Sequence, residues 1–170
     1  MESEFLKMFL IASIICLLPA IYNLTVVRFG KYFDEYITNF CDECVVGTYT
    51  INKDKSVDVK GSVYIKFSKV KRIPFKFNNV FGNFHIANSD LTTLRNCPKF
   101  VERNFCITNT KITNLEYLPL TIEGNMVFND NKLLKSLDGL ESNNTLGTKS
   151  FDDGLYEVYL RSKQIDDILK

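Results

Sequence analysis

The sequence repeats itself every 21 residues, and this repeat runs from Val59 to about Ser142. Its blocks share four apolar columns in the same register. The columns are Val63/Phe84/Phe105/Met126, Ile65/Ile86/Ile107/Phe128, Val70/Leu91/Ile112/Leu133 and Ile73/Leu94/Leu115, where the last block slips by one residue to Leu137. A chain that is 45% apolar would fill under half of these positions by chance. The repeat therefore reports a structural period.

The length of the period restricts the architecture. About 20 residues is too short for a pair of helices and fits one strand and one return segment per turn. Phe84 and Ile86 are separated by one residue, which places both side chains on the same face of a short strand. Equivalent strands of successive turns stack about 4.8 Å apart, so their inward side chains extend one core. The spacing predicts an α/β solenoid with parallel strands over residues 59–142.

The order of polar and apolar positions resembles a known repeat family. It reads apolar-x-apolar-x-x-polar-x-apolar-x-x-apolar, which is similar to the leucine-rich repeat. FGNFHIANSDLTTLRNCPKFV and ERNFCITNTKITNLEYLPLTI look like the short Pro-containing repeats of bacterial and bacteriophage proteins of that family, with Pro98 and Pro119 in register. The resemblance covers roughly Tyr49 to Leu140 and implies a short leucine-rich-repeat array of about four turns.

One departure from that family concerns its ladder of asparagines, whose side chains bond the backbone of neighbouring turns. The same column holds Ser68, Ser89, Thr110 and Asn131 in this sequence. Hydroxyl groups satisfy turn backbone groups with fewer hydrogen bonds than an amide does. We therefore expect a looser ladder than the family consensus implies.

Residues 1–28 form a separate apolar segment. Met8–Val27 contains 20 residues without a charge, bracketed by Lys7 and Arg28. Such a run makes about 30 Å of helix, enough to cross the hydrocarbon core of a bilayer. We interpret it as a single-pass membrane or signal-anchor helix. A cleaved signal peptide and a helix buried in protein are the alternatives.

The flanks of the repeat are expected to cap it. Residues 29–58 begin with an amphipathic helix over Phe29–Phe40, whose aromatic-rich face would cover the open end of the first turn. The same face also suits a membrane interface. Residues 143–170 are expected to form the C-terminal cap, with SNNTLGTKS as a loop and a helix N-terminus at Ser150–Asp153. The following residues have a largely helical pattern, although LYEVYLR also fits a strand.

The outward positions of the predicted strands form a free, concave sheet face. Many repeat proteins bind protein or peptide on such a face, so it is the candidate binding site. The candidate residues are Tyr64, Lys66, Asn83, His85, Asn104, Cys106, Thr108, Asn125 and Asn129. A few short turns make a small surface, so we expect modest affinity.

Groups suited to catalysis are few. His85 is the only histidine, and no Ser or Cys nucleophile or Gly-rich phosphate loop stands in a recognisable motif. Cys41 and Cys44 form a C-x-x-C pair that suits redox or zinc chemistry. Zinc would need two more ligands, whereas Cys97, Cys106 and His85 fall in different columns of the repeat. We therefore expect no enzyme activity, no cofactor and no metal site.

Composition narrows the class of partner. The 21 basic and 20 acidic residues give a net charge of +1, which offers no general attraction to a polyanion. Five cysteines are an odd number, which argues against a disulfide framework and favours a reducing compartment. We expect a protein partner and no nucleic acid, with membrane attachment through residues 8–27.

These observations favour a non-catalytic leucine-rich-repeat interaction module, held at a membrane and of phage or other viral origin. The alternative is a structural component of a virion or membrane complex. A thiol or zinc protein that uses the C-x-x-C pair is the third hypothesis.

Overall fold

The computed structural model describes residues 28–66 and 69–168, and it divides the chain into two compact units, Met1–Asn39 and Phe40–Lys170. The predicted membrane segment, Met8–Val27, lies outside the described residues. Among the residues that are described, no helix is both long enough and apolar enough to cross a bilayer.

A helix occupies residues 28–44, which confirms the amphipathic helix expected over Phe29–Phe40. At its N-terminal end Phe29 and Tyr32 are 76% and 73% exposed, and the expectation that the aromatic face covers the first turn stays a prediction. Its last turn belongs to the second unit and is packed. There the Phe40 ring meets Phe75 edge to face, with 5.3 Å between the ring centroids.

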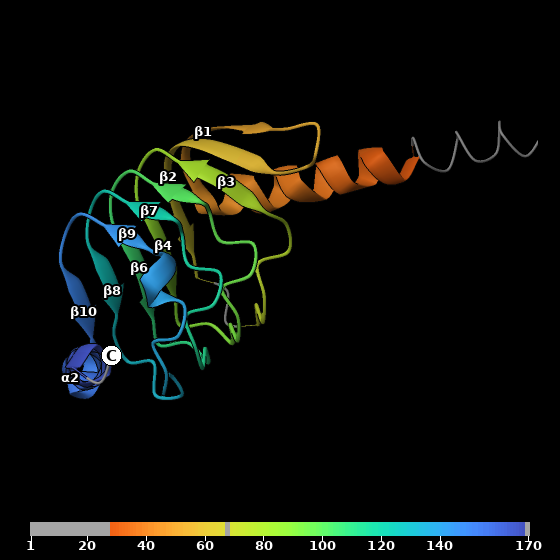
Figure 1. Cartoon of the computed structure of the whole chain (residues 1–170). Coiled ribbons are helices and arrows are strands. Elements are labelled where there is room, and N and C mark those ends of the chain that lie inside the picture. The colour runs from red at the N-terminus through yellow and green to blue at the C-terminus, as the bar shows by residue number, and fades with distance from the viewer. Residues whose placement is uncertain (1–27, 67–68, 169–170) are drawn as a thin grey trace, which may run out of the picture. The chain divides into compact units, whose positions relative to one another are not determined.

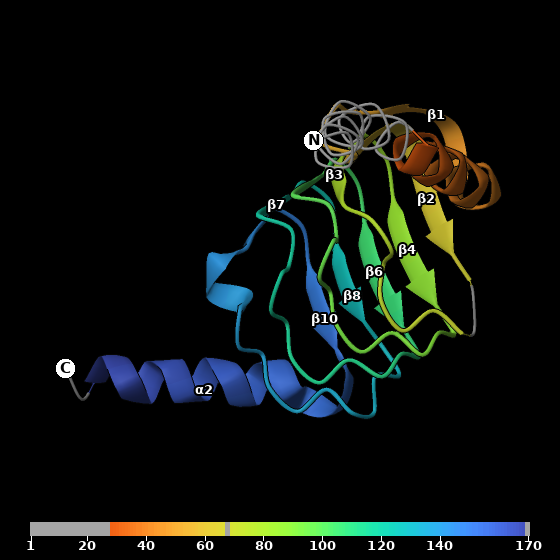
Figure 2. The same cartoon turned by 90° about the vertical axis from the view of Figure 1, so that its right-hand side faces the viewer.

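The second unit is a parallel β solenoid of about four turns (Figures 1 and 2). Strand β1 (Val45–Ile51) forms an antiparallel hairpin with β2 (Val57–Ile65). One parallel row then continues from β2 through β3 (Phe77–Val80), β5 (Phe100–Val101), β7 (Thr121–Ile122) and β9 (Asn144–Thr145). The other continues from β2 through β4 (Phe84–Ala87), β6 (Phe105–Thr108), β8 (Met126–Phe128) and β10 (Lys149–Phe151).

Each turn therefore carries two short strands, where one strand and a return segment had been expected. The chain bends between them, and β2 is long enough to belong to both rows. Successive turns come very close at this corner. A Cβ atom on Gly82 would lie 2.3 Å from the carbonyl oxygen of Gly61, so the stacking there requires a glycine.

The predicted core columns are confirmed almost throughout. Both strand columns, from Val63 and Ile65 onward, are fully buried in all four turns. The exceptions are both in the third column: Val70 is only partly buried, and Leu133 is 46% exposed. Leu134, which is partly buried, takes the column position expected for Leu133. Leu134 stands three residues before Leu137, just as Leu91 stands three residues before Leu94. The one-residue slip in the last block thus comes before Leu134.

The stretch expected to be a loop after Leu140 contains a further rung of the solenoid. After a short 3-10 helix, η1 (Leu140–Ser142), strands β9 and β10 pair in parallel with β7 and β8. Phe151 aligns with Phe128, and their rings stack with centroids 5.4 Å apart. The predicted helix N-terminus at Ser150 is wrong for this reason. The 23-residue interval between these two phenylalanines and the polar Thr145 and Lys149 hid the rung from the 21-residue pattern.

A helix follows the last rung as its cap. The 3-10 turn η2 (Asp152–Gly154) leads into α2 (Leu155–Ile168). The ring of Phe151 stacks on Tyr156 at 5.6 Å, which continues the column of core aromatics into the first turn of the helix. Beyond that turn α2 runs away from the rung (Figure 2), and Val158 and Ile165 are exposed.

Replacing Ile107 with aspartate should abolish cooperative unfolding. Ile107 is fully buried between equivalent isoleucine and phenylalanine side chains of neighbouring turns, and an unpaired carboxylate there costs more than about 4 kcal/mol. Thr108→Asp, one residue further on and partly exposed, should leave a cooperative transition. Urea denaturation followed by circular dichroism measures both. Equal damage from the two changes would contradict the strand register.

Candidate functional site

The centre of the candidate face is one column of outward side chains on β2, β4, β6 and β8. Tyr64 pairs in register with His85, His85 with Cys106, and Cys106 with Val127. The rings of Tyr64 and His85 meet edge to face, with 6.1 Å between centroids. All four side chains are half-buried. The structure thus brings three of the predicted site residues, Tyr64, His85 and Cys106, together into a continuous strip that a partner could cover.

A second column lies two residues further along each strand. Ala87 and Thr108 are paired in register on β4 and β6, and Lys66 and Asn129 follow on the flanking turns. Lys66 and Asn129 are exposed, Thr108 is half-buried and Ala87 is only 8% exposed. This column provides polar contacts beside the aromatic strip.

The three predicted asparagines at the other edge have a different role. The side-chain oxygen of Asn83 accepts the backbone N–H of Asn104 at 3.2 Å, and that of Asn104 accepts the N–H of Asn125 at 2.9 Å. Asn125 accepts the N–H of Thr148 at 3.0 Å, while Ser62 receives the N–H of Asn83 at 3.0 Å. Asn83, Asn104 and Asn125 therefore form an asparagine ladder that ties the turns together at the bend.

The column in which a depleted asparagine ladder was expected holds Ser89, Thr110 and Asn131 among the described residues. Its side-chain hydrogen bonds between turns involve the last two of these residues. The Thr110 hydroxyl donates to the side-chain oxygen of Asn131 at 2.6 Å, and the Asn131 N–H donates to Asp152 at 3.1 Å. Ser89 accepts only within its own turn, from the N–H of Leu91 at 3.4 Å. Among the described residues of this column, side-chain bonds between turns therefore begin at Thr110, and the expectation of a ladder looser than the family consensus stays a prediction. The asparagine ladder runs at the other end of the strands.

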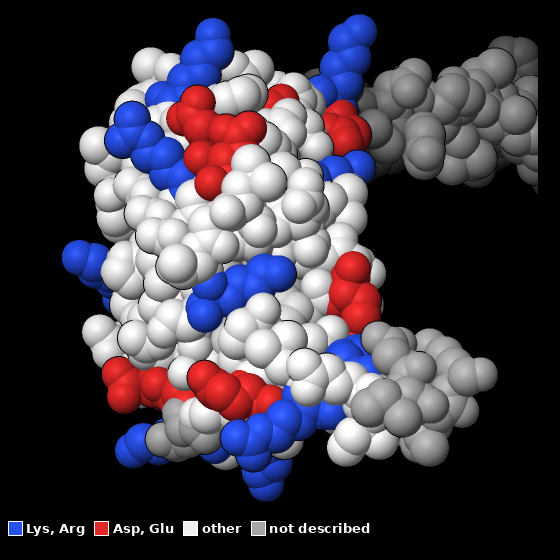
Figure 3. All heavy atoms as spheres, turned by 60° about the vertical axis from the view of Figure 1, so that its left-hand side comes forward, with Lys and Arg blue, Asp and Glu red and all other residues white. Residues whose placement is uncertain are grey.

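The face is nearly neutral in charge. Partial burial, followed by the positive charge of Lys66, lowers the pKa of His85 below its ordinary value, so the imidazole is uncharged at neutral pH. Burial raises the pKa of the Cys106 thiol, which stays protonated. Viewed from the side on which β8 and β10 lie in Figure 1, much of the surface is uncharged, with most charged side chains near the top and bottom and a basic side chain across the middle (Figure 3). Such a surface suits protein contacts that are not driven by charge.

The C-x-x-C pair lies inside the protein. Cys41 and Cys44 are both buried at the end of the N-terminal helix. Burial raises the pKa of each thiol to about 12; Asp42 is a smaller cause for Cys41, and Cys41 and Glu43 are smaller causes for Cys44. Protonated thiols of this kind are poor nucleophiles at neutral pH. In the described residues, no three His, Cys, Asp or Glu side chains come together in a way that could hold a metal ion.

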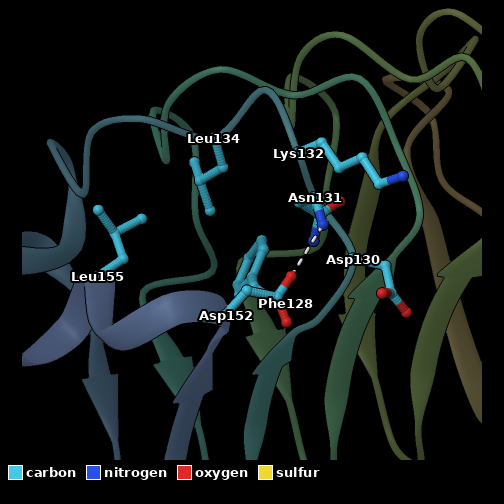
Figure 4. A pocket seen from close by; sticks show the side chains of 7 residues that line it. All are labelled: Phe128, Asp130, Asn131, Lys132, Leu134, Asp152 and Leu155. Atoms are coloured by element: carbon cyan, nitrogen blue, oxygen red, sulfur yellow. Dashed lines mark hydrogen bonds between the residues drawn. The ribbon is translucent and has the colours of Figure 1, made fainter.

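The sequence did not point to a pocket of about 280 Å³ at the C-terminal end of the array. Figure 4 shows Asp130 and Lys132 on one side of it and Leu134 and Leu155 on the other, with the hydrogen bond from Asn131 to Asp152 between them. The pocket is lined by residues of the last two turns and of the cap. The 21-residue pattern did not predict it, because the last rung follows after 23 residues. Aligning TLGTKSF with IEGNMVF would have revealed the additional rung that brings Asp152 to this place.

Comparison with protein-family models, with curated proteins and with solved structures gave no match to this chain. The fold itself, a parallel solenoid with stacked turns of about 21 residues, is compatible with a binding module.

Acidification should destabilise the protein through His85. Its pKa is lowered in the folded state, so the unfolded chain binds the proton more readily, and stability falls as the pH drops below the unfolded value of about 6.5. The midpoint of thermal unfolding should decrease from pH 7.5 to pH 5.5 in the wild type. His85→Gln should remove most of this decrease, because the sequence contains no other histidine. A wild-type midpoint that rises, or the same decrease in both proteins, would contradict the assignment.

Proposed function

We propose that this chain is a non-catalytic protein-interaction module of the leucine-rich-repeat kind, which binds a protein partner on the outward face of β2, β4, β6 and β8. The observation that carries the proposal is the strip formed by Tyr64, His85 and Cys106. These side chains are half-buried, uncharged at neutral pH and aligned in register on consecutive strands. Aromatic residues with little charge at the centre of a surface are typical of interface cores.

Rigidity supports the same function. The strip is flanked by the asparagine ladder on one side and by the polar Thr108 and Asn129 on the other. The inward neighbours of the strip, such as Phe84, Phe105 and Ile107, are fully buried. A face held in this way loses little conformational entropy when it binds, which partly offsets its small area.

The buried thiols support a non-enzymatic interpretation. Cys41, Cys44 and Cys97 are all buried, and burial raises the pKa of each. Thiolates are the reactive species in redox and metal chemistry, so these groups are better suited to packing than to catalysis.

A second candidate function is that of a structural component in an assembly such as a virion or membrane complex. The exposed aromatic side chains Phe29, Tyr32 and Tyr36 favour it, because exposed rings in a row on one helix are suited to contacts with another molecule. In that case the N-terminal helix would make the contact in place of the sheet face.

Two threonines of one turn provide a matched test. Thr108 lies on the sheet face and Thr113 on the exposed return segment. If the face binds the partner, Thr108→Arg should reduce recovery of that partner at least tenfold, whereas Thr113→Arg should leave recovery unchanged. The measurement is quantitative mass spectrometry of proteins captured by the tagged full chain from its source cells.

The opposite pattern would overturn the face assignment. If Thr108→Arg retains the partner and Tyr32→Glu loses it, the assembly candidate replaces the interaction module. Circular dichroism of each variant would establish that the substitutions leave the fold intact.

A further inference from the structure

The loops that follow β4, β6 and β8 share a residue with left-handed backbone conformation. Asn88, Asn109 and Asp130 occupy this position, with φ angles of 53°, 50° and 59°. The Asn109 amide donates to the side-chain oxygen of Asn88 at 2.8 Å. Asp130 ends this ladder, because a carboxylate has no N–H to donate. The backbone does not require a negative charge here, since asparagine serves in both preceding turns.

The column two residues further along these loops also ends on a charge without a partner. Asp90 and Lys111 form an ion pair at 2.7 Å between two turns, and Lys132 is the next residue in that column. Within the part of the chain that the structure describes, the side chains of Asp130 and Lys132 form no hydrogen bond or ion pair. Opposite charges, both exposed, thus stand two residues apart on one loop.

Asp130 and Lys132 line the pocket of about 280 Å³ at the C-terminal end of the array (Figure 4). Asp152 adds a third charge. Its Oδ2 atom accepts a backbone N–H at 3.1 Å, and its side chain has no other hydrogen bond among the described residues. Leu134 and Leu155, both half-buried, form the opposite wall. The pocket therefore combines two carboxylates and one ammonium group with an aliphatic wall.

This combination matches a small zwitterion with an apolar chain. A ligand ammonium would bond to Asp130 and to the Oδ1 atom of Asp152. A ligand carboxylate would bond to Lys132, whose flexible stem lets its ammonium turn towards the ligand. Pockets for drug-sized ligands measure about 300–1,000 Å³, so this pocket suits a smaller molecule.

We propose that the pocket binds a free α-amino acid with an aliphatic side chain. The ammonium and carboxylate groups of such a molecule are attached to one carbon atom, which matches opposite charges two residues apart on one loop. A simple amine would leave Lys132 without a partner, and a simple carboxylic acid would leave Asp130 without one. The aliphatic side chain would lie against Leu134 and Leu155.

This inference goes beyond the proposed function and does not depend on it. The residues that line the pocket do not belong to the strip of Tyr64, His85 and Cys106. Loss of the protein partner on Thr108→Arg, measured separately, would leave amino-acid binding unchanged.

Titration of the isotope-labelled full chain with leucine, followed by nuclear magnetic resonance, tests the proposal. The backbone amide signals of Asn131, Lys132 and Leu155 should shift in a saturable way, because these residues line the pocket. The full chain is used so that any segment that fills the pocket in solution competes with the ligand. The absence of a saturable shift at these amides would overturn the proposal.

Related ligands test each part of the match. Glycine has no aliphatic side chain and should bind about tenfold more weakly than leucine. N-acetylleucine lacks the ammonium group and leucinamide lacks the carboxylate, so each should also lose about tenfold in affinity. Leucinamide or N-acetylleucine binding as tightly as leucine would contradict the recognition of a zwitterion.

Asp130→Asn and Asp138→Asn are a matched pair of variants. Both remove one negative charge from the same turn, but Asp138 is exposed and does not line the pocket. Asp130→Asn should keep the fold, because asparagine occupies this position in the two preceding turns. It should weaken leucine binding about tenfold, whereas Asp138→Asn should bind leucine like the wild type. Equal affinities of the two variants would show that the pocket is not the site.

Lys132→Gln separates contact with the ligand from support of the loop. This variant should bind leucine about tenfold more weakly and should bind leucinamide as the wild type does, because leucinamide has no carboxylate for Lys132 to meet. An equal loss for both ligands would contradict the contact between Lys132 and the ligand carboxylate.

Discussion

The structure depends on hydrogen bonds that run from each turn of the solenoid to its neighbours. A turn of about 21 residues has no core of its own, so it is stable only against the turns beside it. The N–H of Phe84 donates to Asn104 at 2.9 Å and that of Phe105 to Asn125 at 2.8 Å, and the asparagine ladder repeats the same step with side chains. These bonds hold the strands in register, and that register places the inward residues in columns and the outward residues in a strip.

The first and last turns of such a stack would each expose core side chains unless they were capped, and the two ends of this solenoid are capped in different ways. At the C-terminal end, Asp152 accepts the N–H of Asn131, and the rings of Phe151 and Tyr156 close the core column. At the other end β1 pairs with β2 in the antiparallel sense, which ends the parallel stack.

Much of the fold could be predicted from the sequence, because stacking repeats the same environment in every turn and so imposes the same kind of residue. The columns of Ile65 and Phe84 are the clearest case. Where stacking imposes no apolar residue, prediction failed: β10 was missed because Lys149 fills an inward register position. The candidate site was harder, since an outward amide can bind a partner or a neighbouring turn. Tyr64 and His85 were placed correctly on the face, but the role of Asn104 in the ladder requires the position of the Asn125 N–H, which only the folded chain supplies.

Native-state hydrogen exchange of individual amides tests the stacking account most directly. The N–H groups of Asn104 and Asn125 are received by side chains of the preceding turn, so we predict protection as strong as that of the strand amide of Phe105. All three should open only with global unfolding. Exchange of Asn104 and Asn125 as fast as that of Lys53 in the exposed turn, with Phe105 still protected, would show that the asparagine ladder does not hold the turns together.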